Sequence, residues 1–406
     1  YGLMLLTLDL SATANLAEAQ AKIAAQIKDN PDRKWILGRG WDAARWNLGR
    51  TPTTADLDSV TGVIPAFLLS ADGELRWANS AALRAAGLAK ITGPLNAAQV
   101  AQLRRLVPQP SARDRDTAFE KAQRALLANG VTAVSDIGMT INDWQSYRRA
   151  GDRGALRMRI IGYADGVEQM VAIAGPEPTP WLYDDRLRMV GVTFTLDGTI
   201  GSRTAWMKQP PTRSARIAST PLRNQMSRAA MDGFQINLIA HGDAAVDEAI
   251  DAFAEMSATY SGDRRWRIGG VEVLDATDAA RFASGQVTPV LSDSSISQPP
   301  LLPLRQNPHL AIGSFAPSVP PSPFAIIARM VTEHSDVGSA LNDITRNPAR
   351  AAFAETRLGA LEPGQSGDFL LIDQDISAAS SQDIAAAKVL ETWIGGRRVY
   401  VNAPSQ

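Results

Sequence analysis

The feature that most constrains the fold of this chain is a long alternation of strand-like and helix-like segments between residues 114 and 333. Short apolar runs alternate with segments whose apolar side chains recur at helical spacing. This pattern is typical of parallel strands joined by crossover helices, and seven strands in succession favour a closed, TIM-type (β/α) barrel of the α/β class over an open sheet. The predicted strands are 131–135, 157–163, 188–196, 235–240, 266–273, 287–292 and 309–314, and the predicted helices are 114–128, 221–232, 244–257, 276–283 and 323–333.

The two ends of the chain follow other patterns. Short strands and helices at about residues 30–110 predict an excursion before the barrel proper. After Gly338, strand-like segments at 368–373 and 389–401, with a hairpin turn at Gly395-Gly396, predict a small and incomplete β-sandwich satellite. We therefore predict a barrel domain over residues 1–334 and a C-terminal segment with β-sandwich strands over residues 335–406.

Composition excludes several classes of partner. A formal net charge of −1 over 406 residues gives no field that attracts nucleic acid or an anionic membrane, so the expected partner is a small molecule, with a homo-oligomer as a further possibility. Because the chain has no cysteine, disulfides, thiolate nucleophiles and cysteine zinc sites are excluded.

The apolar run Leu3–Leu10 is too short for a membrane span and no basic segment precedes it. We expect no signal peptide in this sequence. The cellular compartment stays open, and the sequence as written favours the cytoplasm.

Specific strings along the chain resemble one family of enzymes. The run Gly191–Trp206, with Leu-Asp-Gly-Thr-Ile-Gly-Ser-Arg inside it, and the run Gly233–Asp243, which contains Ala-His-Gly-Asp, resemble the metal-dependent amidohydrolase superfamily. The chain is most similar to its amidohydrolase family 3 branch, which includes the N-substituted formamide deformylases. The resemblance implies hydrolysis of amide-type C–N bonds at the C-terminal ends of barrel strands. Further matching segments, in the same order, are Gly38–Asp42, Asp72–Ser80, Asn129–Asp136, Asn347–Ala349, Gly364–Phe369 and Trp393–Arg397.

The resemblance implies metal ligands at the strand ends, where this chain, with only three histidines, has other residues. The family typically places a lysine at Thr193, histidines at Ile239 and Gly270, and an aspartate at Phe315. A first strand with a His-x-His pair would lie just before Tyr1, outside this sequence. Zinc needs about three or four nitrogen, oxygen or sulfur ligands, and these side chains offer at most one weak hydroxyl. We therefore expect no catalytic metal, no metal-activated water and no other cofactor.

The same replacements predict an apolar cavity in place of a metal cage. The residues expected to line this cavity are Ile239, Gly270 and Phe315, with Trp77 at its rim. At Glu74 the family usually has a histidine that faces the substrate. A carboxylate in an apolar cavity has a raised pKa and suits a general base near neutral pH, so Glu74 is a candidate for metal-free catalysis. The alternative is an exposed loop carboxylate or a partner of Arg76.

Polar residues near the strand ends are further candidates. His241 lies two residues beyond Ile239 and could serve as acid, base or anion binder, or else as a hydrogen-bonded structural group. The resemblance puts Asp197 and Arg203 close to the site, where Asp197 is a catalytic candidate and Arg203 could bind a substrate carbonyl or carboxylate. The alternative is an ion pair between the two that braces the loop. Asp136 and Thr193 are candidates for substrate binding.

Three functions therefore stay open at the level of sequence. The first is the amide-type C–N hydrolase that the resemblance implies. The second is a metal-free enzyme, of natural or engineered origin, with a carboxylate general base. The third is a non-catalytic small-molecule binder or scaffold in which the motif residues persist because they pack.

Overall fold

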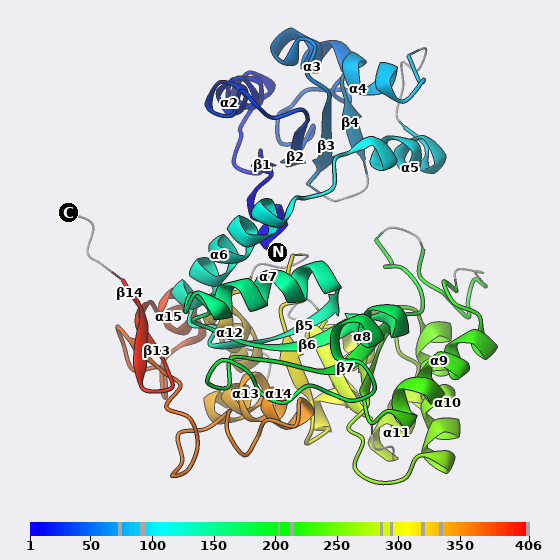
Figure 1. The fold of residues 1–406 in the computed structure, drawn as a ribbon, viewed down its shortest axis with the longest axis vertical. Helices are drawn as coiled ribbons and strands as arrows, with labels where there is room; N and C mark the ends of the chain where they lie inside the picture. The colour runs from blue at the N-terminus through cyan, green and yellow to red at the C-terminus, as the bar shows by residue number, and fades with distance from the viewer. Residues whose placement is uncertain are drawn as a thin grey trace. The chain divides into compact units, whose positions relative to one another are not determined.

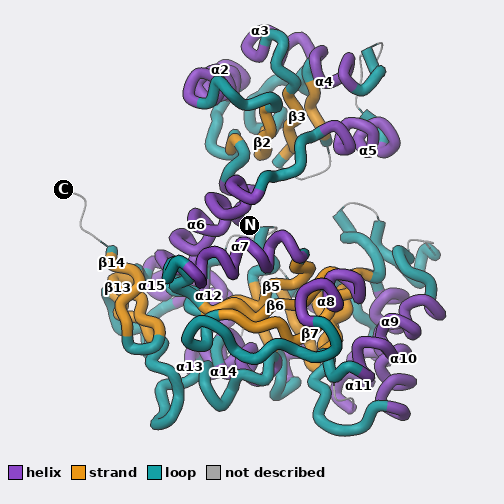
Figure 2. The backbone as a smooth tube through the Cα atoms, viewed as in Figure 1, coloured by secondary structure: helices purple, strands orange, loops and turns teal. Residues whose placement is uncertain are grey.

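Figure 1 shows the computed structural model of the chain, which describes residues 1–71, 75–89, 95–201, 204–211, 215–284, 287–292, 295–317, 321–332 and 336–402. The chain divides into two compact units, Tyr1–Ala118 and Phe119–Gln406. Helices and strands follow one another through both units, as the tube in Figure 2 makes plain. In the part of the chain that the structure describes, no helix combines the length and the apolar character that crossing a membrane requires.

The first unit contains a four-stranded sheet in the order β1-β2-β3-β4, in which β4 runs antiparallel to β3 and the other neighbours are parallel. Helix α2 begins where the Asn15 side chain accepts a hydrogen bond from the backbone amide of Glu18, and it buries Ala19 and Ile23. The predicted excursion at about residues 30–110 falls within this unit. Its elements are α1 (Gly2–Leu5), β1 (Leu8–Asp9), α2 (Leu16–Asp29), β2 (Ile36–Trp41), α3 (Thr54–Thr61), β3 (Ala66–Ser70), β4 (Arg76–Ala78), α4 (Ser80–Ala85) and α5 (Ala97–Leu106).

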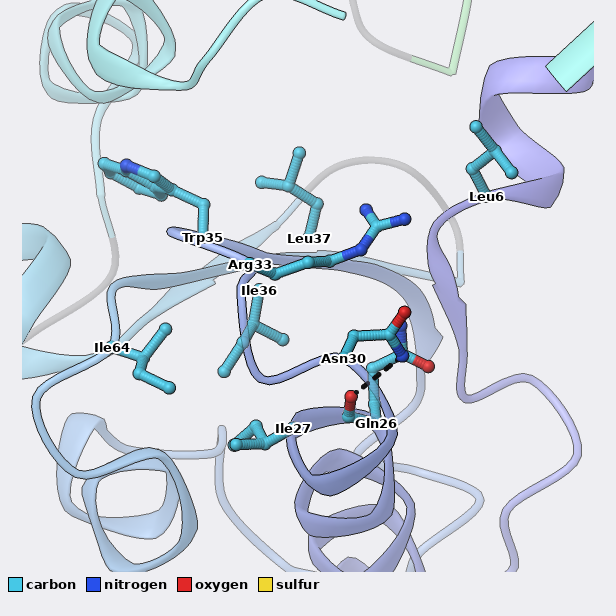
Figure 3. Close-up of a pocket in the computed structure, with 9 residues that line it drawn as sticks. All are labelled: Leu6, Gln26, Ile27, Asn30, Arg33, Trp35, Ile36, Leu37 and Ile64. Atoms are coloured by element: carbon cyan, nitrogen blue, oxygen red, sulfur yellow. Dashed lines mark hydrogen bonds between the residues drawn. The ribbon is translucent and has the colours of Figure 1, made fainter. Parts of the chain in front are cut away.

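A small cavity lies beside the C-terminal end of α2 in this unit (Figure 3). Ile27, Arg33 and Trp35 are among its lining residues, and the Asn30 amide donates a hydrogen bond of 3.1 Å to the carbonyl oxygen of Gln26 at its wall. Its volume of about 10 Å³ holds no more than a single water molecule, so this cavity cannot take an organic substrate.

The second unit is built on a curled, entirely parallel sheet of seven strands in the order β11-β10-β9-β8-β7-β6-β5 (Figure 1). Each strand lies beside its neighbour in the sequence, which is the arrangement that the strand and helix alternation predicts. The strands are β5 (Ala133–Met139), β6 (Arg159–Asp165), β7 (Leu187–Thr195), β8 (Gln235–Ile239), β9 (Arg267–Gly269), β10 (Thr288–Ser292) and β11 (Ala311–Gly313). The helices between and after them are α6 (Ala112–Ala128), which spans the boundary of the units, α7 (Ile141–Asp152), α8 (Gly166–Ala174), α9 (Ser219–Met231), α10 (Asp243–Thr259), α11 (Ala276–Ser284), α12 (Pro323–Thr332), α13 (Val337–Ile344) and α14 (Arg346–Ala351), with a 3₁₀ helix at Pro299–Gln306.

The barrel prediction is confirmed in part. Seven parallel strands curl as in a TIM-type fold, but among the described residues β5 and β11 each pair with one strand only, so the sheet is a partial barrel and not a closed one. The periodicity of a sequence identifies strands without identifying which hydrogen bonds close a sheet, and the prediction of closure went further than the pattern allowed.

The β-sandwich prediction is likewise confirmed only for part of its strands. Strands β12 (Phe369–Ile372), β13 (Val389–Ile394) and β14 (Arg397–Val401) form one antiparallel sheet, with α15 (Ser381–Ala386) between the first two. The predicted turn at Gly395-Gly396 is present, and both glycines have the positive φ angles, 59° and 71°, that a two-residue hairpin turn needs.

Buried polar contacts fasten this sheet to the rest of the second unit. The Thr392 hydroxyl donates a hydrogen bond of 2.7 Å to the carbonyl oxygen of Leu127 in α6. Arg159, at the start of β6, has a side chain that is 2% exposed, and its Nε and Nη2 donate to the two carboxylate oxygens of Asp368 at 2.6 and 2.8 Å. The same carboxylate accepts the backbone amide of Gly395 at 2.8 Å. The C-terminal sheet and the parallel sheet therefore share a buried ion pair.

Asp343 in α13 is expected to make stability fall as pH rises. Burial raises the pKa of Asp343 to about 6, against the opposing effect of a 2.9 Å hydrogen bond from Asn347. An acid whose pKa is higher in the folded state binds its proton more tightly there. Its contribution to the free energy of unfolding is therefore fully present below about pH 4 and is lost as pH rises through 6. We expect Asp343→Asn, which keeps the acceptor for Asn347, to be more stable than the wild type by on the order of 1 kcal/mol at pH 7, allowing for solvent screening, and to show no such gain at pH 4. Urea unfolding at the two pH values measures this, and an equal difference at both would contradict it.

Candidate active site

The candidate site is centred on His241 and Asp197, which follow neighbouring strands β8 and β7. Asp197 is 0% exposed, and its Oδ1 accepts a hydrogen bond from the backbone amide of His241 at 2.9 Å and lies 3.2 Å from Nδ1 of the same residue. Its Oδ2 accepts the backbone amides of Trp206 and Gly242 at 2.8 and 2.9 Å. The carboxylate therefore holds the loop after β7 and the turn after β8 in one arrangement.

The charge state of Asp197 follows from these contacts. Burial by itself would raise the pKa of Asp197, but the hydrogen bonds from the His241 ring and from three backbone amides outweigh it and lower the pKa below its usual value. An ionised Asp197 accepts a hydrogen bond from Nδ1 of His241, so the neutral imidazole carries its proton on Nδ1 and leaves Nε2 with a free lone pair. This is the tautomer that a general base requires.

Glycines and apolar side chains lie close to the His241 ring. Gly270 has a φ of 77°, and a Cβ atom added there would lie 3.1 Å from Nε2 of His241. A Cβ at Gly269 would lie 3.3 Å from the ring of Phe315 and 3.4 Å from Cδ1 of Ile239. The predicted lining residues Ile239, Gly270 and Phe315 are thus brought together with His241 at the C-terminal ends of β8 and β9, where the two glycines allow this close packing.

The remaining candidates in this unit lie on the sheet. Thr193 on β7 is 3% exposed, and its hydroxyl accepts a hydrogen bond of 3.2 Å from the amide of Asn237 on β8. Asp136 on β5 accepts a hydrogen bond of 2.7 Å from the hydroxyl of Tyr147. Burial raises the pKa of Asp136, the Tyr147 hydrogen bond opposes that rise, and the Asp143 carboxylate adds to it. Nothing in the structure joins Asp136 to His241, so its part in substrate binding stays a prediction.

Three further candidates are Trp77, Glu74 and Arg203. Trp77 belongs to the first unit, where its side chain is 3% exposed and packs edge-on against Trp41 and Trp46 at ring distances of 6.1 Å. Its indole nitrogen donates a hydrogen bond of 2.7 Å to the carbonyl oxygen of Thr53, so Trp77 fills a core. Glu74 and Arg203 lie outside the described residues, and the roles suggested for them stay predictions.

Sequence reasoning missed the contacts that fix the turn after β8. The backbone amide of Glu272 donates to the carbonyl oxygen of His241 at 3.1 Å, and its carboxylate accepts the amide of Ile200 at 3.0 Å. Lys208 contacts the carboxylates of Asp247, Asp275 and Asp278 at 3.2, 2.8 and 3.0 Å. These partners are far apart in the sequence, and the only available signal was the clustering of acidic residues between 243 and 278.

Among the described residues, the strand ends do not present the donor set of a metal centre. Within the described ranges, no three side chains among the histidines, aspartates and glutamates are grouped so that they could hold an ion. Thr193, Ile239, Gly270 and Phe315 occupy positions at or near these ends, and a hydroxyl, two hydrocarbon side chains and a glycine do not supply the nitrogen and oxygen ligands that zinc needs.

Comparison with known proteins shows what the chain is related to. A model described as the amidohydrolase family matches residues 1–400. The protein LONG AFTER FAR-RED 3 of Arabidopsis thaliana is 25% identical, with 98% of this chain and 79% of that protein covered. An N-substituted formamide deformylase of Arthrobacter pascens is 23% identical, with 94% and 82% covered. A solved structure of an uncharacterized metal-dependent hydrolase from Pyrococcus horikoshii has the same fold, with a TM-score of 0.78 at 20% identity over 94% of this chain and 84% of that one. The chain belongs to the amidohydrolase family, as the motifs of its sequence indicated.

Proposed function

We propose that this protein hydrolyses an amide-type C–N bond with His241 as general base and Asp197 as the residue that orients it. Membership of the amidohydrolase family supports the reaction class. The observation that carries the proposal is the 3.2 Å contact between Asp197 Oδ1 and His241 Nδ1, with glycines and apolar side chains next to the His241 ring. A histidine held by a buried carboxylate is an arrangement that hydrolases of unrelated folds use for proton transfer.

The proposed reaction uses water as the nucleophile. Nε2 of His241 accepts a proton as the water oxygen bonds to the carbonyl carbon of the substrate, and the C–N bond then breaks as Nε2 returns this proton to the leaving nitrogen. The products are a carboxylic acid and an amine. Asp197 keeps the proton on Nδ1 throughout and stabilises the imidazolium that forms between the two steps.

The substrate class follows from the walls of the site. Phe315 and Ile239 offer hydrocarbon surface, and they pack closely against the glycines at 269 and 270 beside His241, which favours a substrate with a small reacting group. An N-substituted formamide has the smallest acyl group of any amide and can carry an apolar substituent. The relative from Arthrobacter pascens is named for acting on such compounds. We therefore propose N-substituted formamides as the substrates to test first.

The test is amine release from a panel of N-substituted formamides and acetamides, with the protein treated with a chelator and then assayed with and without added zinc. We expect turnover that does not depend on zinc. Turnover that appears only with zinc would contradict the metal-free proposal and point to ligands other than the described residues. Saturable binding of the amides without amine release would favour the non-catalytic binder.

A further inference from the structure

One face of the parallel sheet carries a row of buried polar side chains that the proposed reaction does not use. The hydroxyl of Tyr163 on β6 donates to the amide oxygen of Gln235 on β8 across Gly191 of β7, which has no side chain to block it. One strand further on, Arg267 of β9 pairs in register with Asn237 of β8 and Thr288 of β10. All of these polar residues are 4% exposed or less.

Arg267 is a buried cation that has no counter-ion among the described residues. Its side chain is 4% exposed, and its guanidinium carbon lies 3.8 Å from the centre of the Tyr163 ring. Its Nε is buried with no hydrogen-bond acceptor, and no described residue accepts a hydrogen bond from it or forms an ion pair with it. Burial lowers the pKa of Arg267, with no carboxylate to oppose the effect. The aromatic ring compensates for only a part of the lost hydration.

The neighbours of Arg267 do not supply the missing negative charge. Burial raises the pKa of Tyr163, which is therefore a neutral phenol, and its proton is donated to Gln235. The amide group of Gln235 donates in turn to the carbonyl oxygens of Arg265 and Ala351. Arg188 adds a second guanidinium group whose Nε is buried without a partner. Its Nη1 lies 3.4 Å from the carbonyl oxygen of Phe353, and its guanidinium carbon lies 5.1 Å from the centre of the Trp181 ring.

Two other arginines of the same unit, one buried and one half-buried, do have carboxylate partners. Arg159 is paired with Asp368 at 2.6 Å, and Arg265 is paired with Glu355 at 2.7 Å. Arg267 departs from that pattern, although it is more deeply buried than Arg265. A guanidinium group without hydrogen-bond acceptors has N–H donors that are free to bind a ligand. These donors lie in one plane, and their spacing matches the oxygen atoms of a planar oxyanion.

We infer that Arg267 is an anion-binding site in the interior of the sheet, for a small planar oxyanion of the carboxylate type. The side chain is 4% exposed, which leaves too small an area open for a large substrate. A bound anion would supply both the counter-charge and the acceptors that the guanidinium group lacks. The inference stands on the surroundings of Arg267 and does not depend on the hydrolysis proposed above.

The test is thermal unfolding of the full chain in increasing sodium nitrate, at constant ionic strength set with a bulky sulfonate. Nitrate is planar like a carboxylate but is not a product of amide hydrolysis, so its effect is separate from occupation of the site at His241. We expect a saturable rise in Tm of about 3 °C for the wild type. Formate should act as nitrate does, whereas tetrahedral phosphate and spherical chloride should act only at much higher concentrations, if the fork geometry selects the ligand.

Variants of Arg267 test whether the rise in Tm with nitrate comes from binding at this residue. Arg267→Met keeps the aliphatic stem and removes the charge, and its Tm should no longer respond to nitrate. Arg267→Lys keeps the charge without the fork, and its half-saturating nitrate concentration should be raised about 10-fold. Arg223→Met is the matched control, because Arg223 is already paired with Glu248 and Glu255 at 2.5 and 2.6 Å, and its response should equal that of the wild type. A wild type without a saturable response, or an unchanged response in both Arg267 variants, would overturn the inference.

Discussion

Replacing His241 by glutamine is expected to lower kcat for amide hydrolysis by about 10²- to 10⁴-fold, the usual contribution of a general base. Glutamine can still donate a hydrogen bond to Asp197, so the loop after β7 should keep its place, but its amide cannot take a proton from water. Because the proton moves only in the transition state, KM should change little. The measurement is the rate of amine release at saturating substrate, over a range of pH.

The matched control is His309→Gln, since His309 is exposed and lies in the turn before β11, away from the candidate site. Its rate should equal that of the wild type. Equal rates for wild type and His241→Gln would remove His241 from the mechanism, and the site would then have to be sought among residues outside the described ranges.

Replacing Arg159 by methionine is expected to lower the free energy of unfolding by about 3–5 kcal/mol, the usual cost of removing one partner of a buried ion pair. Arg159 makes two hydrogen bonds to Asp368 and a third, of 2.6 Å, to the carbonyl oxygen of Asp185. Without it, the Asp368 carboxylate stays 10% exposed with one backbone amide, that of Gly395, as its remaining donor. The loss therefore comes from a charge left buried without its partner.

Urea unfolding measures this loss. Arg124→Met is the control, because the pair between Arg124 and Glu120 in α6 is 72% and 63% exposed at 3.4 Å and should contribute less than about 0.5 kcal/mol. The double variant Arg159→Met with Asp368→Asn should recover part of the stability, since it also removes the unpaired charge. A loss at Arg159 no larger than that at Arg124 would show that the ion pair does not hold the two sheets together.

Periodicity predicted the parallel sheet well and its short strands less well. Strands β6 and β7 are almost entirely buried apolar runs, and the ranges predicted for them, 157–163 and 188–196, agree with the structure to within two residues. The strand predicted at 266–273 is observed only as Arg267–Gly269. Gly270 takes a φ of 77° and ends the pairing, and an apolar run does not reveal where the backbone turns away.

The candidate site was predicted one residue at a time but not as a set of contacts. His241 and Asp197 were candidates because each follows a strand, and side chains that follow neighbouring parallel strands meet at one end of the sheet. From the sequence, an ion pair between Asp197 and Arg203 that stabilises the loop was as good an explanation of Asp197 as a role in the site. The backbone amides of Trp206, His241 and Gly242 that settle the place of Asp197 in the loop come from positions 9 to 45 residues away. The pair between Arg159 and Asp368 spans 209 residues, a separation over which no local pattern carries a signal.

The ion pair between Arg159 and Asp368 also bears on how the chain is made. Synthesis delivers the parallel strands long before residue 368, so a nascent chain whose sheet has already collapsed holds the Arg159 guanidinium in an apolar environment with no anion to meet it. Full stability of the larger unit is therefore expected only once residue 368 has been synthesised. Chains that end before residue 368 lack this counter-ion and are expected to be less stable and more open to proteolysis.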